Sequence, residues 1–169
     1  MEYDPKNEAI TEVERKTGPS NFLRAMSHRP EATKEFAALY DTLMGPGAVD
    51  ERLKELVYVA VSSVNECKYC GSHHDVSARR AGVTDHELDD IKAETDQTFD
   101  ERERAALRYA RELTRTADAE HETKDMIENL FTAEQRVELT MVVALANFTN
   151  RFNNGLRIPV EKQRHWTAQ

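Results

Sequence analysis

Cysteine is scarce in this chain of 169 residues, which contains only two, Cys67 and Cys70. Cysteines three positions apart close only a very short loop when they form a disulfide, so they cannot join distant parts of a fold. A disulfide-stabilised scaffold is therefore excluded. A domain of this length buries roughly 70% of its unfolded surface, which is enough for a stable core without cross-links.

Long apolar runs are absent as well. The longest apolar-rich run covers residues 141–146, whereas a membrane-spanning helix needs about 20 apolar residues. The N-terminus begins Met1-Glu2-Tyr3-Asp4-Pro5 without an apolar stretch, so we expect no signal peptide, no membrane association and a cytoplasmic location. Thiols are kept reduced in that compartment, where a Cys-x-x-Cys pair is more typical of catalysis or metal binding than of a structural disulfide.

Basic residues are in the minority, with 23 Lys and Arg against 31 Asp and Glu and a formal net charge of −8 at pH 7. Nucleic-acid binding depends on a basic surface, so we expect no nucleic-acid partner. Aromatic residues make up 7% and charged residues 32% of the chain. This balance is typical of helices with surfaces rich in Glu, Arg and Lys.

The chain has helical periodicity and no run of alternating strand character. We predict an all-α, single-domain helical bundle of roughly seven to eight helices. Residues 1–18 are polar and predict an N-terminal arm, residues 19–160 form the helical domain, and residues 161–169 form a polar C-terminal tail.

Capping residues predict where the helices begin. The predicted starts are Ser20, Pro30, Asp50, the cysteine segment, Thr84 with Glu87, Asp100, Thr123, and Thr132 with Gln135. Gly82 and Gly155 are predicted to end helices. The core face of the last helix is predicted from its spacing as Val137, Met141, Ala144, Leu145 and Phe148.

The two cysteines fall where one predicted helix ends and the next begins. A thiolate is the reactive form of cysteine, and a helix N-terminus lowers the thiol pKa from its ordinary value of about 8.5. Cys67 and Cys70 are three positions apart and share a helix face, so they are able to form a disulfide. His74 follows Cys70 by four residues on that face and is the candidate proton carrier. His73 is the weaker candidate for this role.

Glu55 precedes Cys67 by 12 residues and lies on the preceding predicted helix. If the two helices pack side by side, Glu55 faces the dithiol from the opposite wall. A carboxylate beside a histidine is typical of a proton relay. Cys67, Cys70, His74 and Glu55 are therefore the candidate catalytic residues.

These residues resemble those of AhpD-like alkylhydroperoxidases of the carboxymuconolactone decarboxylase superfamily, whose pattern is Glu-x11-Cys-x-x-Cys-x-x-x-His. The resemblance spans residues 19–160 and is strongest to the peroxidase-related branch. It is carried further by Leu53-Lys54-Glu55-Leu56-Val57, Asn65-Glu66-Cys67-Lys68-Tyr69-Cys70, Ala78-Arg79-Arg80-Ala81-Gly82-Val83 and Asn147-Phe148-Thr149-Asn150-Arg151-Phe152.

The resemblance implies an all-helical homo-oligomer, a trimer or hexamer, with thiol peroxidase activity. One cysteine would attack a hydroperoxide and become a sulfenic acid, and the other would resolve it to a disulfide, while Glu55 and His74 relay protons. No bound cofactor is implied, only an external dithiol donor such as a dithiol or lipoyl protein. The resemblance leaves open which cysteine attacks; the nearness of His74 favours Cys70. Some members have a histidine before the second cysteine, where this chain has Tyr69.

Three alternatives stay open from the residues. The superfamily also contains lactone decarboxylases, which do not depend on a Cys-x-x-Cys pair. A zinc-binding or redox-sensing module is possible because Cys67, Cys70, His73 and His74 are all ligand types, although adjacent histidines point about 100° apart on a helix. The third alternative is that the cysteines are merely small buried apolar residues.

Overall fold

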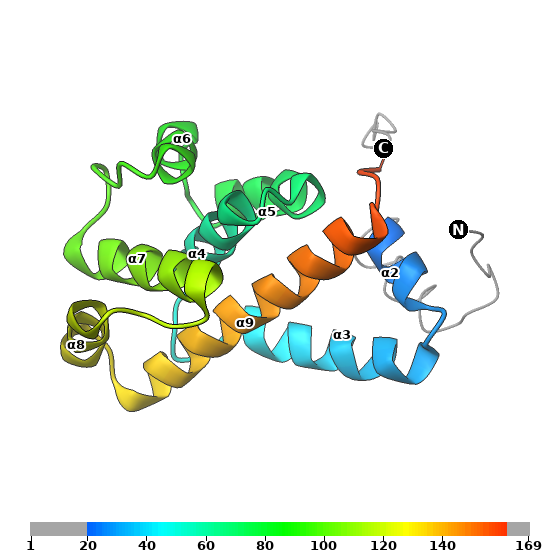
Figure 1. Cartoon of the computed structure of the whole chain (residues 1–169), viewed down its shortest axis with the longest axis horizontal. Coiled ribbons are helices and arrows are strands. Elements are labelled where there is room, and N and C mark those ends of the chain that lie inside the picture. Colours follow the sequence, from blue (N-terminus) through cyan, green and yellow to red (C-terminus); the bar gives the residue numbers. More distant parts are fainter. Residues whose placement is uncertain (1–19, 162–169) are drawn as a thin grey trace.

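The computed structural model describes residues 20–161, which form eight helices and no strand (Figure 1). The predicted all-α single-domain fold is thus confirmed. The predicted arm at 1–18 and the tail beyond Glu161 lie outside the described residues. The helices are α2 (Asn21–Met26), α3 (Pro30–Met44), α4 (Glu51–Val64), α5 (Lys68–Arg80), α6 (Asp85–Ala93), α7 (Glu101–Thr116), α8 (His121–Leu130) and α9 (Ala133–Leu156).

Helix α4 is the centre of the bundle, because it packs against α5, α6, α7 and α9. Every residue from 53 to 62 is buried, including the two charged residues Lys54 and Glu55. A helix that is apolar on nearly all sides can be accommodated only inside a bundle. The helix that carries Glu55 is therefore held from several directions, which fixes the position of that carboxylate.

Buried Lys54 forms an ion pair with Glu138 of α9 and donates to the carbonyl of Gly45 at 2.7 Å. Glu138 also accepts the backbone N–H groups of Ala48 and Val49 at 2.6 and 3.1 Å. A buried charge is tolerated when it is paired and hydrogen-bonded. This pair fixes the loop between α3 and α4 and with it the entry of α4 into the core.

Most of the predicted helix starts are confirmed. The side chains of Ser20, Asp50, Thr84, Asp100 and Thr132 each accept the backbone N–H three residues later. The predicted start at Thr123 is wrong, because α8 begins at His121 and Thr123 is fully buried within it. The Thr123 hydroxyl donates instead to Glu112 of α7 at 2.9 Å, a tertiary contact that local sequence does not indicate.

The predictions for α9 are wrong in two respects. The helix continues through Gly155, ends at Leu156 and is capped by Arg157, which adopts a left-handed φ of 53°. Of the predicted core face only Leu145 is buried; Val137, Met141 and Phe148 are 61%, 41% and 49% exposed, and Ala144 is exposed too. The buried apolar residues are Leu139, Val142, Val143, Leu145 and Ala146. Because α9 has apolar residues on two faces, spacing alone does not decide which face meets α4.

Two apolar clusters divide the interior. The larger one is built from α4 to α9, chiefly from α4, α7 and α9, and the smaller one contains both cysteines. Residues Phe22, Leu23 and Met26 of the short helix α2 pack into the smaller cluster, and Figure 1 shows α2 beside the C-terminal end of α9. The cysteines therefore lie at the edge of the bundle, covered by α2.

Candidate active site

A tight turn between α4 and α5 sets the position of the cysteines. Glu66 adopts a left-handed φ of 50°, and the N–H of Cys67 donates to the carbonyl of Ser62 at 3.0 Å, the bond of a Schellman-type helix end. This conformation costs a residue other than glycine roughly 1–2 kcal/mol. The chain thereby leaves α4 and enters α5 within three residues, so that Cys67 caps α5 and its Sγ accepts the N–H of Cys70 at 3.3 Å.

Cys67 and Cys70 are both buried, and no disulfide joins them. Hydrogen bonding from the Cys67 thiol lowers the pKa of Cys70 to about 7, against the opposing effect of burial. Further donors are the amide of Asn153, whose Nδ2 lies 3.3 Å from Sγ, and the side chains of Asn150 and Thr149. The sequence thus predicts the pair, and the fold surrounds its second member with donors.

The same interaction raises the pKa of Cys67, and burial adds to the increase. The N–H of Cys70 favours negative charge on Cys67, but two adjacent sulfur atoms do not both ionise readily. Cys70 has the larger set of side-chain donors, so it is the sulfur that carries the charge. This order agrees with the preference for Cys70 that the position of His74 suggests.

Glu55 and His74 lie together, 19 residues apart in sequence, as predicted from the side-by-side packing of α4 and α5. His74 Nδ1 lies 2.8 Å from Glu55 Oε2, and both side chains are less than a tenth exposed. A carboxylate only accepts hydrogen bonds, so the proton of the imidazole lies on Nδ1. The other nitrogen, Nε2, is left as an acceptor, which is the form a general base needs.

Two tyrosines that sequence reasoning assigned only to apolar faces complete the surroundings of His74. The ring of Tyr58 stacks on the imidazole at 3.5 Å between centroids and 13° between planes. The Tyr40 hydroxyl lies 3.4 Å from His74 Nε2, and burial raises the pKa of Tyr40, so the hydroxyl stays protonated and donates. Tyr58 follows Glu55 by three residues, a spacing that signals a shared helix face, whereas no local signal links Tyr40 to the site.

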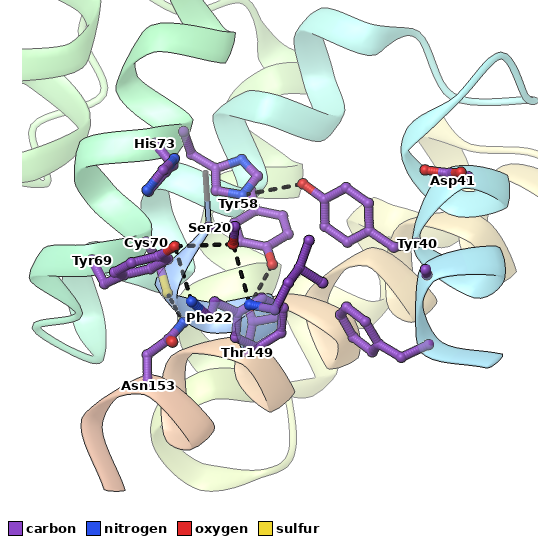
Figure 2. A pocket seen from close by; sticks show the side chains of 14 residues that line it. Ser20, Phe22, Tyr40, Asp41, Tyr58, Tyr69, Cys70, His73, Thr149 and Asn153 are labelled. Atoms are coloured by element: carbon purple, nitrogen blue, oxygen red, sulfur yellow. Dashed lines mark hydrogen bonds between the residues drawn. The ribbon is translucent and has the colours of Figure 1, made fainter. Parts of the chain in front are cut away.

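A cavity of about 210 Å³ joins these groups (Figure 2). Cys70 and His74 both line it, together with Tyr40, Tyr58, Thr149 and Asn153. The remaining lining residues are Ser20, Phe22, Leu23, Phe36, Ala37, Asp41, Tyr69 and His73. A buried thiol of lowered pKa and an imidazole whose Nε2 is hydrogen-bonded only by the Tyr40 hydroxyl among the described residues thus face one mostly apolar space.

Tyr69, in the position where some relatives have histidine, closes this space. Its hydroxyl donates to Glu161 at 2.7 Å and accepts the N–H of Phe22 at 3.2 Å. Glu161 also accepts the N–H of Asn21 at 2.6 Å and lies 2.8 Å from His73 Nε2. These bonds outweigh burial and lower the pKa of Glu161 to about 2. Glu161, expected in a polar tail, therefore joins α2 and the C-terminal segment to α5.

The asparagines of α9 are candidate site residues that the predictions from sequence do not include. Sequence spacing predicts only structural capping or subunit contact for Asn147, Asn150, Arg151 and Asn154, and it does not single out Asn153. Asn150 is fully buried and bonds Asn65 and Ser62 at 3.1 and 3.2 Å. Polar residues every three positions on an otherwise apolar helix face were the available signal.

The lowered pKa of Cys70 predicts a thiol that reacts at neutral pH. Alkylation by iodoacetamide needs the thiolate, so its rate should rise with a midpoint near pH 7, below the ordinary cysteine range. Asn153→Ala removes one donor and should move the midpoint upward by roughly one unit. Stopped alkylation with mass spectrometry of the Cys70 peptide measures both profiles, and identical midpoints in the two proteins would contradict the role of Asn153.

Among residues 20–161 no group of three or more His, Cys, Asp and Glu side chains is arranged to hold a metal ion. His73 is directed to Glu161 and His74 to Glu55, so the two histidines do not converge on the sulfur atoms. The zinc alternative thus has no ligand cluster in the described part of the chain. The helices of this part also lack the combined length and apolarity needed to span a bilayer.

The sequence of residues 30–112 matches the model of the carboxymuconolactone decarboxylase family. This segment runs from α3 into α7 and contains Glu55, both cysteines and His74. This half of the chain is therefore similar to a carboxymuconolactone decarboxylase family domain. Its fold is AhpD-like, as the resemblance in sequence predicted.

Three known proteins illustrate the similarity. The alkylhydroperoxidase AhpD core of an uncharacterized peroxidase-related protein from Ralstonia eutropha is 25% identical, with a TM-score of 0.79 over 90% of this chain and 83% of that one. The debrominase Bmp8, solved with 2,3,4-tribromopyrrole, is 24% identical, with a TM-score of 0.80 over 93% and 86%. Uncharacterized protein 4 in the cox locus of Paracoccus denitrificans is 40% identical over 53 residues, which are 31% of this chain and 48% of that relative.

Proposed function

We propose that the protein is a thiol-dependent peroxidase that reduces hydroperoxides through Cys67 and Cys70. The observation that carries the proposal is the cavity, onto which open both the Cys70 thiol, of lowered pKa, and the imidazole of His74, oriented by Glu55. A sulfur nucleophile and a proton carrier that face the same apolar space are what peroxide reduction requires.

In the first step the Cys70 thiolate attacks the terminal oxygen of R–O–O–H. The S–O bond forms, the O–O bond breaks, and the alkoxide leaves. His74 Nε2, having received the thiol proton, delivers it to the alkoxide, so the products are the alcohol R–OH and the Cys70 sulfenic acid. Glu55 holds Nδ1 protonated and stabilises the imidazolium that forms between the two transfers.

In the second step the Cys67 sulfur attacks the Cys70 sulfenic sulfur and releases water, leaving the Cys67–Cys70 disulfide. The hydrogen bond between the two thiols and the contact of Cys70 N–H with Cys67 Sγ support this step, because they hold the sulfur atoms together. An external dithiol then reduces the disulfide. The sum is R–OOH plus a dithiol giving R–OH, water and the oxidised dithiol, with no bound cofactor; a dithiol or lipoyl protein is the donor we propose.

Two other reactions of relatives serve as alternatives. Lactone decarboxylation follows from the family match alone, and it has no need of the thiol surroundings described above. Reductive dehalogenation is what a debrominase of similar fold carries out. A fold likeness at 24% identity does not extend to substrate, and the thiol geometry supports hydroperoxides as the substrate that we propose.

The direct test is consumption of cumene hydroperoxide by the purified protein with excess dihydrolipoamide. We expect multiple turnovers in the wild type and none in the double variant Cys67→Ser/Cys70→Ser. Parallel incubations with a muconolactone and with tribromopyrrole report the alternatives. Turnover of either, with no thiol-dependent loss of peroxide, would refute the proposal.

The predicted trimer or hexamer and the cytoplasmic location stay predictions. The exposed stripe on α9, formed by Val137, Met141 and Phe148, supports self-association, because large apolar residues are seldom left in a contiguous exposed stripe. Sedimentation or mass photometry of the purified chain measures the assembly.

A further inference from the structure

The described residues of the cavity lining include an acidic residue but no basic residue that could balance its charge. Among the described residues that line the cavity there is no lysine or arginine, and the one acidic lining residue is Asp41. The two histidines are already committed, His73 to Glu161 and His74 to Glu55. No cationic group is therefore available to receive an anionic part of a substrate.

Asp41 places the negative charge of the cavity lining at one end of the cavity. Asp41 is exposed on α3, next to Tyr40, and lines the cavity at the end away from Cys70 (Figure 2). A substrate that reaches Cys70 with its reacting end leaves its other end near this carboxylate. The inner wall is made of Phe22, Leu23, Phe36 and Tyr58, which stabilise an apolar body and offer nothing to a charge.

The volume sets a size limit. Cavities that hold drug-sized ligands measure roughly 300–1,000 Å³, whereas this one measures about 210 Å³. It suits a compact body such as one ring with short substituents. A longer molecule would extend past Asp41 into solvent.

We infer that the cavity selects compact, uncharged apolar hydroperoxides, and that Asp41 is the specificity-determining residue that turns carboxylate-bearing ones away. The inference rests on the proposed function for its substrate and on the cavity lining for its selectivity. Like charges repel across the mouth, while the apolar walls penalise a carboxylate that moves inward. Because Asp41 is exposed, its effect should weaken as ionic strength rises.

Three hydroperoxides that differ at one position test the inference. They are cumene hydroperoxide, its para-carboxylate and its para-carboxamide, which has the shape of the carboxylate without the charge. We expect kcat/KM for the carboxamide to exceed that for the carboxylate by on the order of 100-fold. Asp41→Asn should reduce this ratio by roughly fivefold to tenfold, and 0.5 M salt should reduce it in the wild type.

The matched control is Asp125→Asn on α8, an exposed acid that does not line the cavity. It makes the same change in net charge and should leave the ratio as in the wild type. Equal use of carboxamide and carboxylate by the wild type would overturn the inference. An equal effect of the Asp41 and Asp125 variants would overturn the assignment of Asp41.

A second readout does not depend on peroxidase activity. In Cys67→Ser, Cys70 is the single thiol of the chain, and serine is a good helix-capping residue in place of Cys67. Iodoacetamide and iodoacetate differ only by charge, so their alkylation rates, each divided by the rate with glutathione, report charge selection at Cys70. We expect the normalised rate with iodoacetamide to exceed that with iodoacetate, and we expect Asp41→Asn to reduce the ratio of the two rates. If no hydroperoxide is consumed, the proposed function fails while this pair still decides the inference, and equal normalised rates would overturn it.

Discussion

Cys70→Ser should lower kcat/KM for hydroperoxide by on the order of 10³-fold or more, because it removes the attacking sulfur. Cys67→Ser should have a different effect. It leaves Cys70 able to react once, so one equivalent of peroxide is consumed without reductant, but multiple turnover is lost because no sulfur resolves the sulfenic acid. The difference follows from the opposite pKa directions of the two thiols and from the opening of Cys70 onto the cavity.

Peroxide consumed per chain, measured without reductant, separates the two variants. Dimedone labelling with mass spectrometry should find the sulfenic acid on Cys70 in Cys67→Ser and no such adduct in Cys70→Ser. Circular dichroism and thermal unfolding control for loss of structure; serine at 67 keeps a capping oxygen at the start of α5. Stoichiometric peroxide consumption by Cys70→Ser, with the adduct on Cys67, would reverse the assignment of attacking and resolving sulfur.

The second large effect is expected at His74. His74→Gln should slow peroxide reduction by roughly 10²–10⁴-fold, the usual contribution of a positioned acid and base. Glutamine fills a similar space but transfers no proton at neutral pH. In the smaller variant His74→Ala, added imidazole should restore part of the rate, since that substitution opens space beside Tyr58 and Tyr40, whose rings contact or face the native imidazole. A purely structural role for His74 predicts no such rescue.

Glu55 acts through His74 and is a positioning residue. Glu55→Gln should reduce kcat/KM by roughly tenfold to 100-fold, because a neutral amide accepts the Nδ1 proton but no longer stabilises the imidazolium. The pH profile of kcat/KM distinguishes this from a loss of structure, since the rise assigned to the base should move. His86→Gln, at an exposed position on α6, is the matched control for His74→Gln. An unchanged profile in Glu55→Gln would remove the carboxylate from the relay.

The fold was largely predictable because its signals are local. Helix caps at Ser20, Asp50, Thr84 and Asp100 depend on a side chain and an N–H three residues later, a relation that the sequence contains in full. The wrong prediction at Thr123 arises because the same local rule is applied to a residue whose side chain makes a contact between helices. A threonine that looks like a cap is used instead to bond Glu112 of another helix, which local pattern does not reveal.

The exposure of α9 was not predictable for a different reason. Its two apolar faces are both compatible with helical spacing, and the choice between them depends on which face fits α4 and α7. The face around Leu139 and Val142 was buried, leaving Val137, Met141 and Phe148 in solvent. Packing energy summed over a whole interface made that choice, and no single residue indicates it.

In the candidate site, residue identity and short spacing were enough to define the dithiol at a helix start, the imidazole one turn beyond it and the facing carboxylate of Glu55. Helical geometry relates residues three or four positions apart, so those relations can be read in the chain itself. The donor from Asn153 to Cys70 and the bond from Tyr69 to Glu161 join residues 83 and 92 positions apart. Contacts of that range arise only when α2, α3, α5 and α9 meet, and it is their meeting that assigns the charge to one sulfur and encloses it in an apolar cavity.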